Sequence, residues 1–435
     1  MKFLYQQSPA FPLTHLSLIL PRTGVCLDPP KLRGLSRLMA RLMFMGAGGM
    51  GNIELNGRLE RLGASMGASL ANDNFSLRLS TLTENLEAAL ELFLLSLAQP
   101  NFDAEEFERL RAELASAWVA DREESKQVRA QEVYLHEIFR GAPNGYLPDG
   151  DGEGLARCTL ADVRAQFGRL RDGSEPLLAV LSDLPQGEAE ARIFSKIDFP
   201  TADGQNPHPW DGFAPPPETG RRVVIVPDAD TNTDELVCGA FSGPERDPDW
   251  HIQRLISFIF GGDMNSRLFR SIRGDRGLSY GASCWFESSQ GRGPRDRISP
   301  FSLYTFPAAE HTAEALPLLL GLYEELVEKG VQESELQLAQ QALINSYPFQ
   351  RDTPQKLLGL RLGEALYGLQ DQDEQTHTAR LRDTTQADIL RVLREKHHPD
   401  RLVLVMLGEL ERLKPLAEAI PGVERVEVRP YPATG

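Results

Sequence analysis

The spacing of hydrophobic positions predicts that short buried strands and amphipathic helices follow one another along most of the chain. Within residues 34–46, apolar side chains recur at intervals of three and four residues, as on a helix that packs one face against a core. Residues 74–82 alternate between apolar and polar side chains, which predicts a strand with one buried face. The apolar positions of the helix are Leu35, Leu38, Met39, Leu42 and Met43, and those of the strand include Phe75, Leu77 and Leu79.

The same criteria predict two series of elements separated by a linker. Residues 200–220 are rich in proline, glycine and aspartate, which is typical of a connection between domains. We interpret the glycine-rich residues 46–51 as a flexible connection as well. Before the linker, further strands are expected at 16–21, 65–71 and 177–182, and further helices at 52–62, 83–97, 103–124, 126–140 and 159–170. After it, strands are expected at 223–226, 236–241, from 278 onward and at 402–406, and helices at 249–260, 265–273, 310–328, 333–346, from 354 and from 385.

The second series repeats the first. Asn56-Gly-Arg-Leu59 corresponds to Asn265-Ser-Arg-Leu268, and residues 106–114 correspond to residues 335–343. A duplicated unit accounts for the length, the linker and the order of elements together. We therefore predict an α+β fold with two homologous α/β-sandwich domains, each a mixed or antiparallel sheet with helices packed on it. The predicted domains are residues 1–200 and 221–435, joined by the linker 201–220.

Composition narrows the classes of function. The net charge of -16 over 435 residues argues against a nucleic-acid-binding surface and permits neutral or basic peptide partners. No run of about 18 apolar residues could span a membrane, and the first residues do not resemble a signal peptide, so the cytoplasm is expected. Four scattered cysteines suggest reduced thiols rather than a zinc site: Cys26, Cys158, Cys238 and Cys284.

The polar face of the helix at 34–46 carries three arginines, one helical turn apart: Arg33, Arg37 and Arg41. Two residues four positions apart on one face can share a ligand, which is how histidine pairs bind zinc. A guanidinium is always charged and has no lone pair for a metal. Taken alone, the pattern indicates a solvated basic face, and the alternative is a strip that binds anionic peptides.

This helix resembles the zinc-binding helix of pitrilysin/insulinase-type peptidases, the inverted zincins, of the half-size two-domain kind. Gly34-Leu-Ser-Arg-Leu-Met-Ala-Arg-Leu-Met-Phe-Met-Gly46 matches their phrase Gly-Leu-x-His-x-x-Glu-His-Met-x-Phe-x-Gly at the scaffold positions. The resemblance implies that Arg37 and Arg41 replace the zinc-binding histidines and that Ala40 replaces the general base. Ala117 stands where the third ligand, a glutamate, is expected, and Glu113 lies one helical turn away. The resemblance therefore implies no metal site and no catalytic residue in this chain.

A second phrase resembles a substrate-binding segment of the same family. Ser266-Arg-Leu-Phe269 leads into Ile272-Arg-Gly-Asp-Arg-Gly-Leu-Ser-Tyr280, in which an arginine and a tyrosine lie seven residues apart. In the family such a pair faces the zinc, binds the substrate backbone and stabilises the oxyanion, which implies these roles for Arg273 and Tyr280. The alternative is that Arg273 only offsets the last carbonyls of a helix and that Tyr280 is an ordinary strand aromatic. Arg276 is interpreted as a solvated charge.

The resemblance implies a non-catalytic subunit of a heterodimeric zinc endopeptidase. The partner would be a homologous subunit with an intact H-x-x-E-H motif, which would hold the zinc and act on a peptide substrate. This chain would supply Arg273, Tyr280 and half of a closed chamber. The alternative is a structural or peptide-binding scaffold without a role in proteolysis, and the sequence does not select a substrate.

Overall fold

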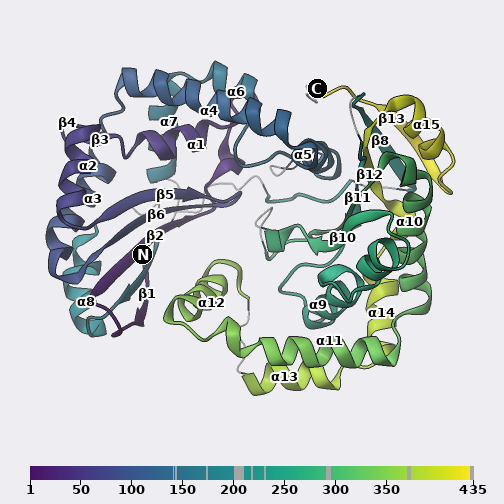
Figure 1. Ribbon diagram of the computed structural model, residues 1–435. Coiled ribbons are helices and arrows are strands. Elements are labelled where there is room, and N and C mark those ends of the chain that lie inside the picture. Colours follow the sequence, from purple (N-terminus) through teal and green to yellow (C-terminus); the bar gives the residue numbers. More distant parts are fainter. Residues whose placement is uncertain are drawn as a thin grey trace. The chain divides into compact units, whose positions relative to one another are not determined.

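The computed structural model describes residues 1–140, 142, 145–172, 175–199, 210–216, 219–229, 232–290, 295–369 and 374–431. The chain divides into two compact units, whose elements are labelled in Figure 1. Unit 1 comprises Met1–Asp121, Leu147–Phe213 and Gln350–Leu366, and unit 2 comprises Arg122–Tyr146, Ala214–Phe349 and Tyr367–Gly435. Residues 200–209 and 217–218 of the predicted linker lie outside the described residues.

Unit 1 is built on a five-stranded sheet with the strand order β1-β7-β2-β6-β5. β1 (Lys2–Gln7) runs parallel to β7 (Leu177–Ser182), whereas β2 (Leu13–Pro21), β6 (Asn74–Leu82) and β5 (Ser65–Leu70) pair in antiparallel fashion. Leu16 of β2 lies opposite Leu79 of β6, and both point into the core beneath the helices. The helices of the unit's own sequence repeat are α1 (Leu35–Leu42), α2 (Asn52–Arg61), α3 (Leu86–Ala98), α4 (Ala104–Glu124), α6 (Gly152–Arg157), α7 (Leu160–Asp172) and α8 (Gln186–Arg192).

Unit 2 is built on a six-stranded sheet with the strand order β10-β11-β9-β12-β8-β13. β12 runs parallel to β8, β8 parallel to β13, and the remaining neighbours are antiparallel. The strands are β8 (Arg221–Pro227), β9 (Glu235–Phe241), β10 (Ser279–Phe286), β11 (Pro300–Pro307), β12 (Val403–Gly408) and β13 (Val423–Val428). The helices are α9 (Trp250–Ser257), the π-helical turns η4 (Phe258–Gly262) and η5 (Phe269–Gly274), α10 (Thr312–Lys329), α11 (Glu333–Ser346), α13 (Glu374–Asp383), α14 (Gln386–Lys396) and α15 (Leu410–Glu418).

The two sheets have the same topology. The order β1-β7-β2-β6-β5 of the first corresponds strand by strand to β8-β12-β9-β11-β10 of the second, with the same parallel and antiparallel pairings. β13 is an additional edge strand. The predicted fold class, two homologous α/β-sandwich domains with mixed sheets, is confirmed.

Each unit takes one helix from the other sequence repeat. α5 (Lys126–Ile138) packs on β9 and β12, on the sheet face opposite to α10 and α14, as Figure 1 shows for unit 2. α12 (Pro354–Tyr367) covers the corresponding face of the unit 1 sheet, where Leu358 packs against Ile19, Ala179 and Leu181. α5 and α12 hold the same place in the two series of elements. The boundaries 1–200 and 221–435 remain a prediction for the two sequence repeats. The two compact units have other boundaries, because α5 and α12 each pack in the unit of the other repeat.

Several elements differ from the sequence-based expectation. Residues 46–51 form a hairpin of β3 (Gly46–Ala47) and β4 (Met50–Gly51) rather than a flexible connection. Its two turn residues, Gly48 and Gly49, both have positive φ, which glycine adopts without a steric penalty. α15 and β13 follow the strand that was expected to close the series. None of the helices in the described part of the chain has the length and hydrophobicity that a membrane crossing requires.

Candidate functional site

Helix α1 presents the residues that occupy the zinc-binding positions of the resemblance. Its first residue follows Gly34, which has a φ of 98°, and no side chain of the helix caps it. The cap comes from Asp28, whose carboxylate accepts hydrogen bonds from the backbone N–H groups of Gly34 (3.0 Å) and Ser36 (2.9 Å). The Ser36 hydroxyl donates a further bond to Asp28 (2.5 Å) and accepts one from Gln166 (2.9 Å). α1 is thus anchored at its start by a buried carboxyl.

The environment of Asp28 changes its acidity. Asp28 is only 6% exposed, and burial raises its pKa to about 7, although the hydrogen bonds from Ser36 and Gly34 act in the opposite direction. The native state therefore binds a proton here at pH values where the unfolded chain has lost it.

The polar face of α1 is cross-linked to α4 by an ion pair. Arg41 donates a hydrogen bond to Glu113 at 2.9 Å, and both side chains are 44% exposed. Arg109 bonds the other oxygen of Glu113 at 3.3 Å and also bonds Glu106 at 2.7 Å, while Asn52 of α2 bonds Glu106 at 3.2 Å. Glu113 lies one helical turn from the expected ligand position. It pairs with Arg41, which stands where the family has a zinc-binding histidine.

The remaining positions offer nothing to a metal. Ala40 is buried, Ala117 is exposed on α4, and neither side chain can donate a lone pair or take up a proton. Within the described ranges, Arg37 has no ion-pair or hydrogen-bond partner, and no group of three or more His, Cys, Asp or Glu side chains could hold a metal ion. Arg41 already has a carboxylate partner, so it does not present the open charge that an anion-binding strip requires.

The second predicted pair lies together in unit 2. The guanidinium carbon of Arg273, on η5, is 4.2 Å from the centre of the Tyr280 ring and 4.8 Å from that of the Phe269 ring. These distances are those of cation–π contacts. The sequence predicted Arg273 and Tyr280 as a pair, and it missed Phe269, although the spacing of four residues on a helix was a signal that its ring could reach Arg273.

The backbone between Arg273 and Tyr280 turns back so that the two side chains meet. Gly277 has a φ of 63° and its N–H bonds the carbonyl of Arg273 at 3.1 Å, while the N–H of Leu278 bonds the carbonyl of Ile272 at 2.9 Å. The register between β10 and β11 then shifts between Ser279 and Ala282, which is a β-bulge. Bulges re-aim side chains, and here Tyr280 is directed outward with 73% of its surface exposed.

Side chains around η5 hold the segment without neutralising Arg273. Arg267 donates to Glu335 at 2.6 Å and thereby joins the start of the segment to α11, and Arg276 pairs with Glu314 at 3.0 Å on the exposed surface. Among the residues that the structure describes, no carboxylate pairs with Arg273 and no hydrogen-bond partner meets the Tyr280 hydroxyl. A guanidinium and a phenol are therefore both available as donors to a carbonyl oxygen.

Comparison with known proteins identifies the family. The family model described as "Insulinase (Peptidase family M16)" matches residues 6–146, and the model described as "Peptidase M16 inactive domain" matches residues 157–343. The chain belongs to the insulinase (M16) family, in the half-size form with one domain of each type.

Individual relatives agree with this assignment. A Helicobacter pylori protein named "Non-peptidase homolog YmxG" is 22% identical over 352 residues, which is 80% of this chain and 78% of that protein. A crystal structure from Pseudomonas fluorescens, described as a peptidase M16 inactive domain, has a TM-score of 0.78 at 20% identity and covers 94% of this chain and 95% of its own. A chain of complex III2 from Candida albicans has a TM-score of 0.73 at 11% identity and covers 94% of both chains. At these identities, the two structures show a shared fold.

Proposed function

We propose that this chain is the non-catalytic subunit of a heterodimeric zinc endopeptidase. The observation that carries the proposal is the contrast between its two site regions. The positions that would bind and activate zinc hold Arg37, Ala40, Arg41 and Ala117. Arg273 and Tyr280 lie side by side, and the described residues supply neither a carboxylate to Arg273 nor a hydrogen-bond partner to the Tyr280 hydroxyl. A homologous subunit with an intact H-x-x-E-H motif supplies the zinc, its ligands and the general base. The name of the Helicobacter pylori relative, a non-peptidase homologue, supports the non-catalytic part of the proposal.

In this proposal the two retained side chains act on the peptide substrate. The Arg273 guanidinium donates hydrogen bonds to backbone carbonyl oxygens, and its five N–H groups tolerate more than one position of the peptide. The Tyr280 hydroxyl donates to the oxygen that becomes negative when the bond is attacked, where a placed donor contributes most. This chain also forms half of the wall of the chamber that encloses the substrate.

Reconstitution with a relative that carries H-x-x-E-H tests the proposal. Cleavage of a fluorogenic peptide should appear only in the mixture, and Tyr280→Phe should lower kcat by about 100-fold, as removal of an oxyanion donor does. Arg273→Ala should raise KM and lower kcat. Arg276→Ala is the matched control, because Arg276 lies in the same loop but pairs with Glu314. Unchanged turnover in both site variants would remove the proposed role.

A second candidate is a structural or peptide-binding scaffold. It is favoured by the likeness of the fold to a chain of the Candida albicans complex III2, in which this fold is part of a complex. Under this alternative a stable complex with the relative still forms, which size-exclusion chromatography would detect, but no mixture cleaves any peptide of a diverse library.

A further inference from the structure

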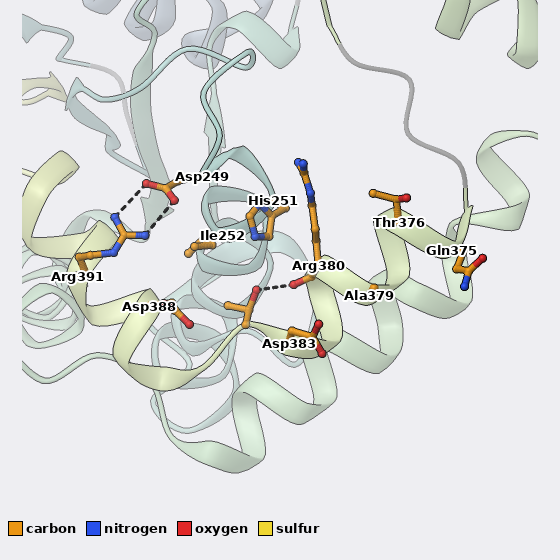
Figure 2. A pocket seen from close by; sticks show the side chains of 11 residues that line it. Asp249, His251, Ile252, Gln375, Thr376, Ala379, Arg380, Asp383, Asp388 and Arg391 are labelled. Atoms are coloured by element: carbon orange, nitrogen blue, oxygen red, sulfur yellow. Dashed lines mark hydrogen bonds and ion pairs between the residues drawn. The ribbon is translucent and has the colours of Figure 1, made fainter.

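Unit 2 contains an open pocket of about 610 Å³ that is lined mostly by polar and charged residues and shares no residue with the Phe269–Arg273–Tyr280 cluster. The start of α9, the length of α13 and the start of α14 form its walls, as Figure 2 shows. Its volume is in the range of sites for small organic molecules or short peptides. The lining residues used below are Asp249, His251, Arg380, Asp383, Asp388 and Arg391.

One wall of the pocket is fixed by charges that are already satisfied. Asp249 accepts hydrogen bonds from Arg391 at 2.9 and 3.1 Å and from Lys396 at 3.0 Å. Asp388 accepts bonds from the backbone N–H (2.9 Å) and the hydroxyl (2.6 Å) of Thr385 through one oxygen and caps α14. These groups give the wall a defined shape before any ligand arrives. Asp388 still adds negative charge to the pocket.

The opposite side carries three polar side chains that keep hydrogen-bonding or ion-pairing capacity within the described part of the chain. His251 donates a hydrogen bond from Nδ1 to the carbonyl of Pro248 at 3.1 Å, so Nδ1 carries the proton and Nε2 of the neutral ring is an acceptor. Arg380 extends beside His251 in Figure 2, and among the described residues its guanidinium has no ion-pair partner. Asp383, one turn further along α13, likewise has no partner within the described ranges.

These groups define the chemistry of a ligand. Arg380 offers a positive fork that matches a carboxylate, whereas His251 accepts from an N–H group and the carboxylates of Asp383 and Asp388 attract a cation. This lining therefore favours a ligand that combines a carboxylate, an N–H group and a positive charge. The C-terminal residue of a peptide meets all three requirements when its side chain is basic.

We propose that this pocket binds the C-terminal lysine or arginine of a peptide. Arg380 binds the terminal carboxylate, His251 accepts the amide N–H of the last residue, and Asp383 and Asp388 hold the basic side chain. The negative charge of the chain, -16, favours the approach of such a cationic peptide. The site is independent of the proposed role of Arg273 and Tyr280.

Three probe peptides test the assignment with the full chain. They are N-acetyl-Ala-Ala-Lys with a free carboxylate, the same peptide as its C-terminal amide, and N-acetyl-Ala-Ala-norleucine, which lacks the positive charge. Isothermal titration or NMR titration at low ionic strength should show saturable binding of the first peptide and about 10-fold weaker binding of each of the others, as expected for the loss of one charge-assisted hydrogen bond.

Variants then link each group to its part of the peptide. In Arg380→Ala the free carboxylate should no longer give an advantage over the amide, and in Asp383→Asn the preference for lysine over norleucine should shrink. Arg382→Ala is the control, because this exposed arginine lies on the same helix and does not line the pocket. No saturable binding, or a preference for the carboxylate that persists in Arg380→Ala, would overturn the proposal. Because Arg380 and Asp383 are exposed, circular dichroism should show that both variants fold.

Discussion

The two halves of the molecule share a topology and differ in how their site charges are used. On α1 and α4 of unit 1, Arg41 is paired with Glu113, which is in turn paired with Arg109. On η5 and β10 of unit 2, the Arg273 guanidinium lies against the rings of Phe269 and Tyr280, and no carboxylate among the described residues pairs with it. An arginine that pairs with a neighbouring carboxylate uses its N–H groups to link two helices. An arginine that packs against aromatic rings keeps its N–H groups available as hydrogen-bond donors.

The halves also differ in the helix that each receives from the other repeat. α12 packs on the unit 1 sheet mainly through apolar side chains such as Leu358. α5 packs on the unit 2 sheet through buried polar groups as well: Glu137 is fully buried and bonds Arg222 and Arg429, and the Tyr134 hydroxyl bonds Ser302 at 2.7 Å. Gly239 is required at this contact, since a Cβ there would collide with the Tyr134 hydroxyl. The same position in the fold is thus stabilised by two kinds of interaction.

The largest effect is expected from restoring the chemistry of unit 1. The variant Arg37→His, Ala40→Glu, Arg41→His, Ala117→Glu should bind one zinc ion per chain with at least micromolar affinity, which corresponds to about 8 kcal/mol. Equilibrium dialysis followed by metal analysis measures this. The matched control carries the other three substitutions and retains Ala117. It should bind zinc more weakly, because Glu113 lies one helical turn from the third-ligand position and does not replace a glutamate at 117. Equal zinc binding by the two variants would show that α4 does not supply the third ligand.

The exchanged helices give the next largest effect. Glu137→Ala should lower the free energy of unfolding of unit 2 by about 3–5 kcal/mol, because it removes the buried carboxylate that bonds Arg222 and Arg429. Leu358→Ala should cost about 2–3 kcal/mol in unit 1 through the loss of apolar contact. Each unit holds two tryptophans, so denaturation is followed in two single-tryptophan backgrounds, one that keeps only Trp210 of unit 1 and one that keeps only Trp250 of unit 2. A larger loss for Leu358→Ala would contradict the difference between the two helices.

Hydrophobic periodicity predicts the individual helices and strands, but it does not predict that α5 and α12 each pack on the sheet of the other repeat. The helices expected at 126–140 and from 354 are present as α5 and α12. The side-chain pattern of a helix shows that one face is buried, but it does not show which of two similar sheets buries it. The exchange depends on contacts far apart in the sequence, such as that between Glu137 and Arg222.

The candidate site could be predicted in part. The spacing of Arg273 and Tyr280 in a known phrase indicated the pair, and the arginines of α1 indicated the loss of zinc ligands. The contact between Arg273 and Tyr280 depends on the β-bulge at Ser279, and no local pattern of residues predicts where a strand will gain a residue. The sequence does not predict the partner of Arg41, because Glu113 lies 72 residues further along the chain and its spacing indicates only a carboxylate one turn from the expected ligand position.

Two carboxyls at the starts of the corresponding helices α1 and α9 should give opposite pH dependences. Burial raises the pKa of Asp28 to about 7, so its contribution to stability falls as pH rises from about 4 to 7, by at most about 1.4 kcal/mol per pH unit. Hydrogen bonds from Arg391 and Lys396 lower the pKa of Asp249 to about 2, so its contribution is present above pH 4 and is lost as pH falls toward 2. Urea denaturation across pH measures both slopes.

Each slope has its own control. Asp28→Asn should remove the loss of stability between pH 4 and 7 and leave the acid limb unchanged. Asp249→Asn should flatten only the acid limb. The contrast between the two helix starts would fail if both substitutions altered the same limb.

A smaller effect is expected from the aromatic support of Arg273. Phe269→Leu keeps an apolar side chain but removes the ring that lies 4.8 Å from the guanidinium carbon. An exposed cation–π contact contributes about 0.5–1 kcal/mol, so KM of the reconstituted peptidase should rise by about 2–5-fold while kcat stays nearly constant. Phe269→Tyr, which retains the ring, should restore the value. An equal rise in Phe269→Tyr would show that Phe269 serves only to pack η5.

The smallest effect is expected from the ion pair of unit 1. Arg41 and Glu113 are each 44% exposed, and exposed pairs contribute little because solvent screens them and both side chains lose rotamer freedom. A double-mutant cycle of Arg41→Ala and Glu113→Ala should therefore give a coupling energy below about 0.5 kcal/mol, which decreases further in 1 M salt. A coupling above about 1.5 kcal/mol that resists salt would mean that the pair ties α1 to α4 as strongly as a buried bridge. In that case Arg41 would have replaced the metal as a structural link, and restoring histidines would cost stability before it restored zinc.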